Sequence, residues 1–81
     1  MSATFEVLYF ASLRDAAGMA SERVQADAAD LAALYDRLRQ RHGFALPRER
    51  VRVAVDGAFA EWNMPPRAGS VVAFIPPVSG G

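Results

Sequence analysis

The stretch from Asp27 to Gly43, DAADLAALYDRLRQRHG, decides the fold of this 81-residue chain because it is its clearest helical pattern. Four apolar side chains recur with the i, i+3, i+4, i+7 spacing of one helical face: Leu31, Leu34, Tyr35 and Leu38. Asp27 is expected to cap the start, Asp30 adds negative charge to the first turn, and Gly43 suits the residue after the last turn. The stretch therefore predicts an amphipathic helix with one buried side.

The segments before this helix are predicted to be two strands joined by a turn. Residues 4–11, TFEVLYFA, are rich in β-branched and aromatic residues, and they are apolar on both faces of an extended chain. Such a segment is typical of a central strand. The following SLRDAAG, residues 12–18, is expected to turn the chain, and SERVQA, residues 21–26, to form a short second strand.

The segments after the helix predict a hairpin and a last strand. Beyond the loop FALPRE, the valines of VRVAV alternate with other residues and run into Asp56-Gly57, which is a strong hairpin signal. Residues 58–62 are therefore expected to return as the partner strand. The run VVAFI, residues 71–75, is apolar on both faces and is predicted to be central.

This order of elements predicts an α+β domain in which one main helix lies across one face of a mixed sheet of about five strands. We expect a compact domain over residues 1–75 and an extended tail over residues 76–81. The tail begins with two prolines, which lack the amide hydrogen that strand pairing needs. No second helix covers the other face, so Leu8, Phe10 and Phe59 are expected to form either an exposed apolar patch or an ordinary face covered by loops.

The composition of the chain argues against several classes of function, among them nucleic-acid binding, membrane binding and thiolate chemistry. The nine basic residues are all arginine and are balanced by nine acidic ones, so no net field attracts nucleic acid or an anionic membrane. The chain has no cysteine, so sulfur chemistry would have to use sulfur from elsewhere, and disulfides and thiolate nucleophiles are absent. No apolar run approaches the roughly 20 residues of a membrane span, and a cytoplasmic location is the default expectation.

Few residues suggest catalysis. His42 is the single histidine and is read as a helix-terminal cation, so no metal site is predicted. The sequence has no nucleophile-elbow serine and no glycine-rich phosphate loop, and the chain is not expected to be an enzyme by itself. Six arginines concentrate between positions 37 and 52, where a solvated or protein-docking face is favoured over nucleic-acid binding. Tyr35 and Trp62 are interpreted as core residues.

The tail PPVSGG, residues 76–81, carries the clearest chemical signal, although a frayed chain end is the commoner fate of such a segment. Two prolines favour an extended exit from the sheet. Gly80 and Gly81 have no Cβ, so they can enter a narrow channel and bring the terminal carboxylate to a partner's reactive group. A carboxylate is a poor electrophile, but adenylation by ATP makes it a mixed anhydride that sulfur or an amine can attack.

Three motifs, VLYFASLRDAAG, the Asp-Gly hairpin and AGSVVAFIPPVSGG, resemble the small sulfur-carrier subunit of molybdopterin synthase, a ubiquitin-like β-grasp family. The resemblance implies that an adenylating enzyme similar to ubiquitin-activating enzymes activates Gly81 with ATP and that a sulfur relay protein converts it to a thiocarboxylate. The large synthase subunit would then pass this sulfur to cyclic pyranopterin monophosphate, in a heterotetramer. The carrier itself would bind no cofactor. Gly80 would be the small residue that permits entry, and Val78 and Ser79 would be gripped by the channel.

The resemblance also implies which residues meet the partners. Phe10, Phe59 and Ile75 match family positions that dock on the open sheet face, and Ile75 stands where the family usually has an aromatic residue. Arg14 matches a polar contact after the first strand, and Pro76 and Pro77 belong to the docked arm. Two alternatives stay open, namely a sulfur carrier for thiamin or cysteine synthesis and a ubiquitin-like protein modifier. A nucleic-acid-binding domain is the third and least favoured.

Overall fold

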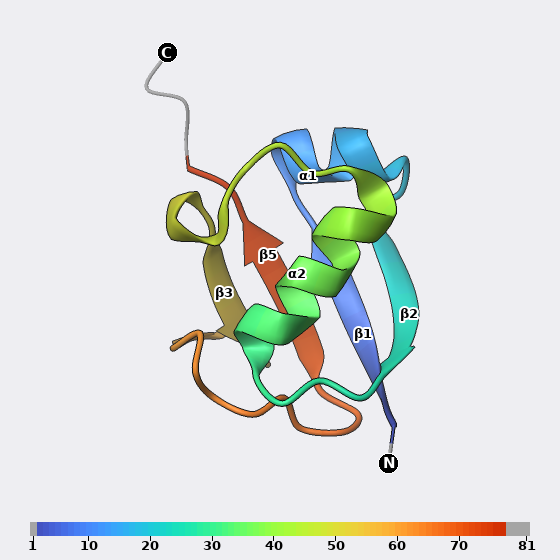
Figure 1. The fold of residues 1–81 in the computed structure, drawn as a ribbon, viewed down its shortest axis with the longest axis vertical. Coiled ribbons are helices and arrows are strands. Elements are labelled where there is room, and N and C mark those ends of the chain that lie inside the picture. Colours follow the sequence, from blue (N-terminus) through green and yellow to red (C-terminus); the bar gives the residue numbers. More distant parts are fainter. Residues whose placement is uncertain (1, 78–81) are drawn as a thin grey trace.

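The computed structural model describes residues 2–77 and has the predicted α+β arrangement, with one main helix across one face of a mixed sheet (Figure 1). The elements in chain order are β1 (Ala3–Tyr9), α1 (Ala11–Ala17), β2 (Ser21–Ala26), α2 (Leu31–His42), η1 (Arg48–Arg50), β3 (Arg52–Val55), β4 (Ala58–Ala60) and β5 (Val71–Ile75). The five strands lie in the order β2-β1-β5-β3-β4. This order makes β5, the last strand, the central one, as predicted. β1 and β5 are parallel, and the other neighbouring strands are antiparallel.

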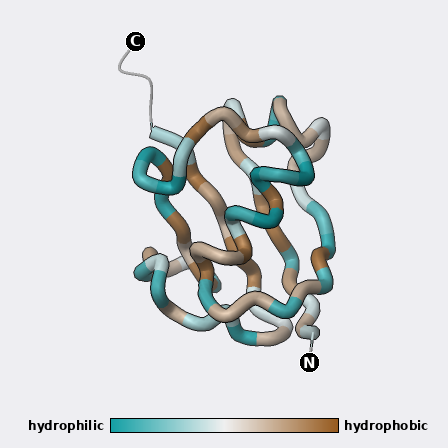
Figure 2. Tube along the Cα trace, in the orientation of Figure 1, coloured by the Kyte–Doolittle hydropathy of each residue, from teal (hydrophilic) through white to brown (hydrophobic). Residues whose placement is uncertain are grey.

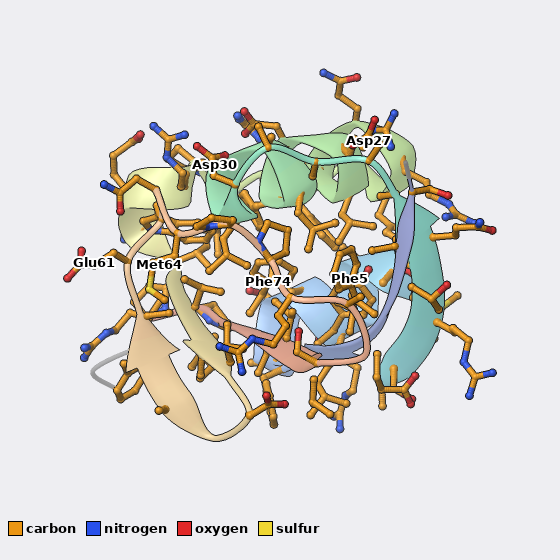
Figure 3. The ribbon with its side chains drawn as sticks, turned by 90° about the horizontal axis from the view of Figure 1, so that it is seen from below. Phe5, Asp27, Asp30, Glu61, Met64 and Phe74 are labelled. Carbon is orange, nitrogen blue, oxygen red and sulfur yellow. The ribbon has the colours of Figure 1, made fainter. Side chains whose placement is uncertain are left out.

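The core lies between α2 and the sheet. Phe5 and Phe74 point from the sheet into this layer (Figure 3), and the predicted apolar face of α2 covers them. The buried helix residues are Leu31, Ala32, Leu34, Tyr35 and Leu38. Figure 2 shows the same division, because the central strands are mostly hydrophobic while hydrophilic residues recur along α2. The periodicity of the sequence thus fixes which side of each element is buried.

Tyr35 and Trp62 pack in the core, as predicted. Tyr35 is fully buried, and its hydroxyl donates a hydrogen bond of 2.7 Å to the carbonyl of Leu46. Burial raises the pKa of this phenol, so it remains a donor. Trp62 is partly buried and stacks on Phe74, with ring centroids 6.0 Å apart. Both aromatic residues therefore serve packing rather than a ligand platform.

The start of α2 differs from the prediction. Asp30, not Asp27, is the N-cap, and its Oδ1 accepts a hydrogen bond of 2.8 Å from the amide of Ala33. The capping chemistry was predicted correctly, but the helix begins one turn later than expected because Asp30 is the residue with extended backbone angles. At the other end Gly43 has a φ of 73°, and its amide donates to the carbonyl of Arg39, as expected for this position.

The partner strand of the hairpin is shorter than predicted. β4 ends at Ala60 instead of continuing to Trp62, because the carbonyls of Trp62 and Met64 accept hydrogen bonds from the first two amides of α2. The chain leaves the sheet to satisfy helix amides that would otherwise lack partners. The hairpin turn itself is confirmed, since Asp56 and Gly57 have φ values of 51° and 88°, the left-handed angles of a type I′ turn.

The segment after β1 is a helix rather than the predicted turn. Residues 11–17 form α1, which is anchored by the buried Leu13 and ends at the left-handed Gly18. The loop FALPRE was likewise predicted without regular structure, and its end forms the single-turn helix η1. Both helices are too short to show a periodic apolar pattern, so the sequence predicted only that the chain reverses there.

Candidate partner-docking site

The candidate site is the open face, which we define as the sheet face opposite α2. Strand register places Leu8, Ala73, Ala54 and Phe59 side by side across β1, β5, β3 and β4. Phe59 is 62% exposed, whereas Ala54 in the middle of the row is buried. The alternation of the sequence correctly predicted that Leu8 and Phe59 share this face.

A second row lies closer to the end of β5. Ile75 pairs with Arg52 of β3, and both side chains follow the face of the first row. Phe10 directly follows β1 with extended backbone angles, so it points to the face of Leu8, and it is 46% exposed. The three apolar residues that the resemblance assigns to docking, Phe10, Phe59 and Ile75, therefore lie on one face of the sheet.

The end of β5 sets where the chain leaves the sheet. β5 runs between β1 and β3 and ends at Ile75, after which Pro76 is buried and Pro77 is exposed. Because β1 is parallel to β5, the C-terminal ends of both strands lie at the same end of the sheet. α1 lies at this end too (Figure 1). The remaining predicted site residues, Val78, Ser79, Gly80 and Gly81, lie outside the described residues.

α1 brings the predicted Arg14 to this end of the sheet. Arg14 is exposed in the last turn of α1 and makes no ion pair within residues 2–77. The helix begins at Ala11, whose φ of 51° is in the left-handed region that costs a residue with a Cβ about 1 kcal/mol. The chain changes direction at Ala11. As a result, Phe10 before it is exposed to solvent, while Leu13 after it is buried.

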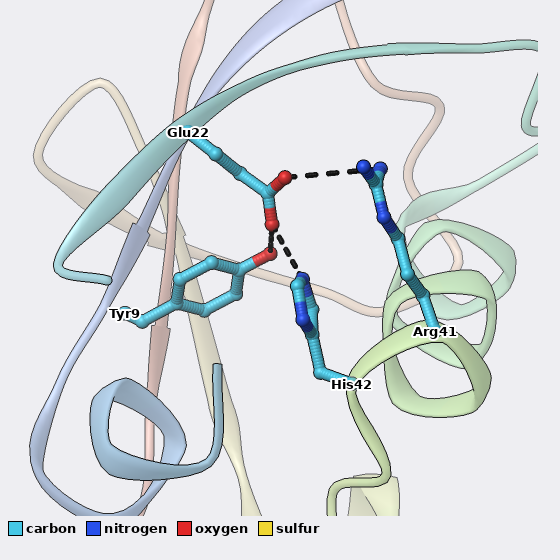
Figure 4. A network of polar contacts seen from close by, with 4 residues as sticks. All are labelled: Tyr9, Glu22, Arg41 and His42. Atoms are coloured by element: carbon cyan, nitrogen blue, oxygen red, sulfur yellow. Dashed lines mark hydrogen bonds and ion pairs between the residues drawn. The ribbon is translucent and has the colours of Figure 1, made fainter. Parts of the chain in front are cut away.

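A partly buried polar network on the covered side of the sheet was not predicted (Figure 4). Tyr9 of β1 donates its hydroxyl to Oε2 of Glu22 in β2 at 2.5 Å, and Nε2 of His42 lies 2.6 Å from the same oxygen. A guanidinium nitrogen of Arg41 lies 3.7 Å from the other carboxylate oxygen. The network ties the first two strands to the last turn of α2, where His42 was expected only as a helix-terminal cation.

The ionisation of this network follows from its contacts. Burial by itself raises the pKa of the Glu22 carboxyl, but hydrogen bonds from Tyr9 and His42, and then the positive charges of His42 and Arg41, outweigh burial and hold that pKa below its usual value. Burial, together with the hydrogen bond to the Glu22 carboxylate, raises the pKa of Tyr9. Glu22 is therefore an anion at neutral pH and Tyr9 a neutral donor, which suits a structural tie.

The arginines that cluster in the sequence divide between surfaces of the fold. Arg37, Arg39 and Arg41 are exposed on α2, and Arg48 and Arg50 belong to η1. Arg52, by contrast, is an exposed residue of β3 on the open face. Consequently the cluster is not one basic surface, and a single arginine of the six stands among the apolar docking residues.

Two other kinds of feature are absent from the part of the chain that the structure describes. Within residues 2–77, no three His, Cys, Asp or Glu side chains gather closely enough to hold a metal ion. None of the helices in this part of the chain has the length and hydropathy needed to cross a membrane. The open face and the end of β5 therefore make up the candidate site.

Comparison with known proteins identifies the family of this chain. The model of the ThiS family matches residues 7–81, which is nearly the whole sequence. The chain belongs to the ThiS family. A comparison with curated protein sequences gives no significant match.

Solved structures similar to this ThiS-family protein include two groups of relatives. SAMP1 from Haloferax volcanii is 30% identical, with a TM-score of 0.79 over 96% of this chain and 99% of that one. A Pyrococcus furiosus protein described as molybdopterin converting factor subunit 1 is 29% identical, with the same TM-score over 95% and 100% of the two chains. A Helicobacter pylori complex of subunits 1 and 2 of molybdopterin-converting factor contains a chain that is 25% identical, with a TM-score of 0.64 over 96% and 99%.

These comparisons confirm the predicted fold and resemblance. The protein has a ubiquitin-like β-grasp fold and belongs with the small carrier and modifier proteins that share it. Small proteins of this ThiS-like, ubiquitin-like class are generally carrier subunits. Its neighbours include both the molybdopterin subunit that the resemblance named and a modifier of the kind kept as an alternative.

Proposed function

We propose that this ThiS-family protein is the small, sulfur-carrying subunit of a molybdopterin synthase. One observation carries the proposal: β5 passes from an apolar docking face, at Ile75, directly into the paired prolines that begin PPVSGG. A partner that covers Phe10, Phe59 and Ile75 would therefore lie beside the start of the tail. The Pyrococcus furiosus and Helicobacter pylori neighbours support molybdopterin as the pathway.

In this proposal the reacting group is the carboxylate of Gly81. An oxygen of that carboxylate attacks the α-phosphorus of ATP in the adenylating enzyme, pyrophosphate leaves, and an acyl adenylate forms. The outer sulfur of a persulfide on the relay protein then displaces AMP and forms an acyl disulfide. A thiol cleaves its S–S bond, forms a new disulfide with the relay sulfur and releases the thiocarboxylate. The large synthase subunit receives this group and transfers its sulfur to cyclic pyranopterin monophosphate. The carrier contributes no catalytic base and holds no cofactor.

The chain's own residues position this group. Pro76 and Pro77 lack amide hydrogens, so they end strand pairing and keep the tail from extending the sheet. Gly80 and Gly81 present no Cβ to a narrow channel, and Val78 and Ser79 fill the channel behind them. The open face supplies the docking surface for both the large subunit and the adenylating enzyme. We propose a heterotetramer with two large subunits, as the resemblance implies.

Intact mass measurement tests the proposal directly. The protein is incubated with its adenylating enzyme, ATP and a sulfur donor, and we expect a mass gain equal to the replacement of one oxygen by sulfur. A variant lacking Gly81 should gain nothing, and a variant extended beyond Gly81 should fold normally but remain unloaded. No mass gain in the unmodified protein, under conditions that load an established carrier, would refute sulfur carriage.

A second function is favoured by the 30% identity with SAMP1, a small archaeal modifier protein. As a modifier, the chain would join its activated Gly81 carboxyl to an amine of another protein. Immunoblots against the protein in its host would then show larger adducts that disappear when Gly81 is deleted. The chain itself contains no lysine, so an amine acceptor has to come from another protein or from an α-amino group. Adducts without thiocarboxylate would favour this function over sulfur carriage.

A further inference from the structure

One arginine on the open face is held in place by an aromatic ring. The guanidinium carbon of Arg52 lies 3.9 Å from the ring centroid of Phe59, on the neighbouring strand β4. A cation over an aromatic face is attracted by the negative potential of the ring. Both side chains are exposed. The stack therefore fixes the orientation of a charged group on the surface that the proposed function uses for docking.

The charge of Arg52 is not neutralised within the described chain. Within residues 2–77, Arg52 has no ion pair, and its guanidinium stacks on the ring of Phe59. The two side chains border a depression of about 250 Å³ that Glu61 and Trp62 also line. Glu61 does not reach Arg52 to pair with it. The depression is thus a recess beside an oriented and unpaired cation.

Most of the open face around Arg52 is apolar, although Glu61 lines the recess beside it. Arg52 is the one charged residue in the two rows of the open face, where its register partner is Ile75 and Ala54 lies two residues along β3. A protein that covers these rows would remove water from the guanidinium. An unpaired buried charge is costly, so a stable complex has to supply an anion at this point.

A carboxylate fits this position better than the phosphate backbone of a nucleic acid. Stacking uses the face of the guanidinium and leaves its N–H edge free, and that edge matches the two oxygens of a carboxylate. A nucleic-acid backbone would need several cations, and the two rows offer one. Because the stack already orients Arg52, little side-chain freedom is lost when the bond forms.

We propose that Arg52 and Phe59 form a carboxylate-binding site that selects a partner surface on which one Asp or Glu side chain projects from an apolar patch. The partner is the large synthase subunit, so this inference rests on the proposed function. Phe10, Phe59 and Ile75 provide the apolar contact area with the partner. Arg52 fixes how the partner is aligned on this face and discriminates between partner surfaces with and without the carboxylate. An apolar surface that lacks the carboxylate leaves Arg52 buried without a partner and is rejected.

The test is the dissociation constant between this protein and its own large subunit, measured by calorimetry at low and high salt. Arg52→Met keeps much of the apolar stem and removes the charge, and we expect binding to weaken at least about tenfold and to lose part of its salt dependence. Arg52→Lys keeps the charge without the planar fork and should weaken binding by a smaller factor. Arg37→Met is the matched control, since it removes the same charge from the helix side of the molecule, and it should bind within about twofold of the unmodified protein.

A double-mutant cycle separates a positioned arginine from a general charge effect. Phe59→Leu keeps apolar contact but removes the ring, so it should release the guanidinium. If Phe59 acts partly by holding Arg52, the loss caused by Phe59→Leu is smaller in the Arg52→Met background than in the unmodified protein. Glu61→Gln should bind equally well or more tightly, because it removes a carboxylate from the rim of the recess. Unfolding midpoints of all variants establish that the folds are intact.

Three results would overturn all or part of the inference, and they can be told apart. Binding of Arg52→Met within about twofold of the unmodified protein, with the same salt dependence, rejects the carboxylate site and leaves the proposed function standing. Absence of any binding between the unmodified protein and the large subunit rejects both. Strictly additive losses in the double-mutant cycle reject the role of Phe59 in positioning Arg52.

Discussion

The two faces of the sheet are built by the same strands and differ in almost every other respect. On the face under α2, Val7 and Phe74 are fully buried, and Tyr9 is joined to a polar network. On the open face, Phe10 and Phe59 remain largely exposed. Because successive side chains of a strand point to opposite faces, one short segment contributes both to the core and to the exposed face. The comparison teaches that the functions of adjacent residues can be changed separately.

The largest effect is expected on the covered face, for Phe74→Ala. The Phe74 ring is fully buried against Tyr35 and Trp62, with centroid distances of 5.2 and 6.0 Å. Its loss leaves a cavity under α2 and should lower the free energy of unfolding by about 3–5 kcal/mol. Urea denaturation followed by circular dichroism measures this change. A loss below about 1 kcal/mol would mean that the covered face is not the core.

A smaller effect is expected for Glu22→Gln, also on the covered face. Gln keeps an acceptor for Tyr9 but loses the charge that His42 and Arg41 contact, so we expect a loss of about 1–3 kcal/mol at pH 7. The pKa of Glu22 is lower in the folded protein than its ordinary 4.5, so its contribution is present above that value. It is lost as the pH falls through the folded-state pKa.

The pH dependence provides the control for this variant. Unfolding free energies of the unmodified protein should decline from about pH 5 downward, and Glu22→Gln should decline less steeply over the same range. Tyr9 and His42 form hydrogen bonds with the carboxylate, and the Arg41 guanidinium faces it, so all three belong to the titrating environment. Parallel pH profiles for the two proteins would show that the network does not stabilise the fold.

The sequence predicted elements that depend on local pattern. The apolar face of α2 followed from the spacing of its leucines, and the hairpin followed from Asp56-Gly57, because both signals lie within one element. The open face followed from strand alternation and from the lack of a second long helix. These predictions hold because buried residues recur along the chain with the period of the element, about 3.6 residues in a helix and two in a strand.

What the sequence did not predict depends on contacts between distant residues. Glu22 and His42 are 20 positions apart, and nothing in either segment indicates that α2 ends beside β2. Arg52 looked like one member of a basic run, and only strand register separates it from the arginines of α2 and places it over Phe59. Strand register is a tertiary property, so the rows of the open face could be predicted in part, whereas the contact between Arg52 and Phe59 could not.

An intermediate effect is expected for Asp30→Ala, which removes the cap of the helix that covers one face. The bond from Asp30 to the Ala33 amide should be lost, and the free energy of unfolding should fall by about 1 kcal/mol. Asp36→Ala is the matched control, because Asp36 is exposed inside the same helix and alanine favours helix there. Thermal unfolding of both variants decides the assignment, and an equal loss in the two would contradict the cap at Asp30.

The smallest effect on stability is expected for Phe59→Ala, the open-face counterpart of Phe74→Ala. The Phe59 ring is 62% exposed, and its stack with Arg52 contributes about 0.5–1 kcal/mol at such a site, so the free energy of unfolding should fall by less than about 1 kcal/mol. Binding to the large subunit should nevertheless weaken about tenfold, because an exposed aromatic residue gains its contacts in the complex. Urea denaturation and calorimetry measure the two quantities on one sample. A stability loss as large as that of Phe74→Ala would break the comparison, because the open face would then be part of the core.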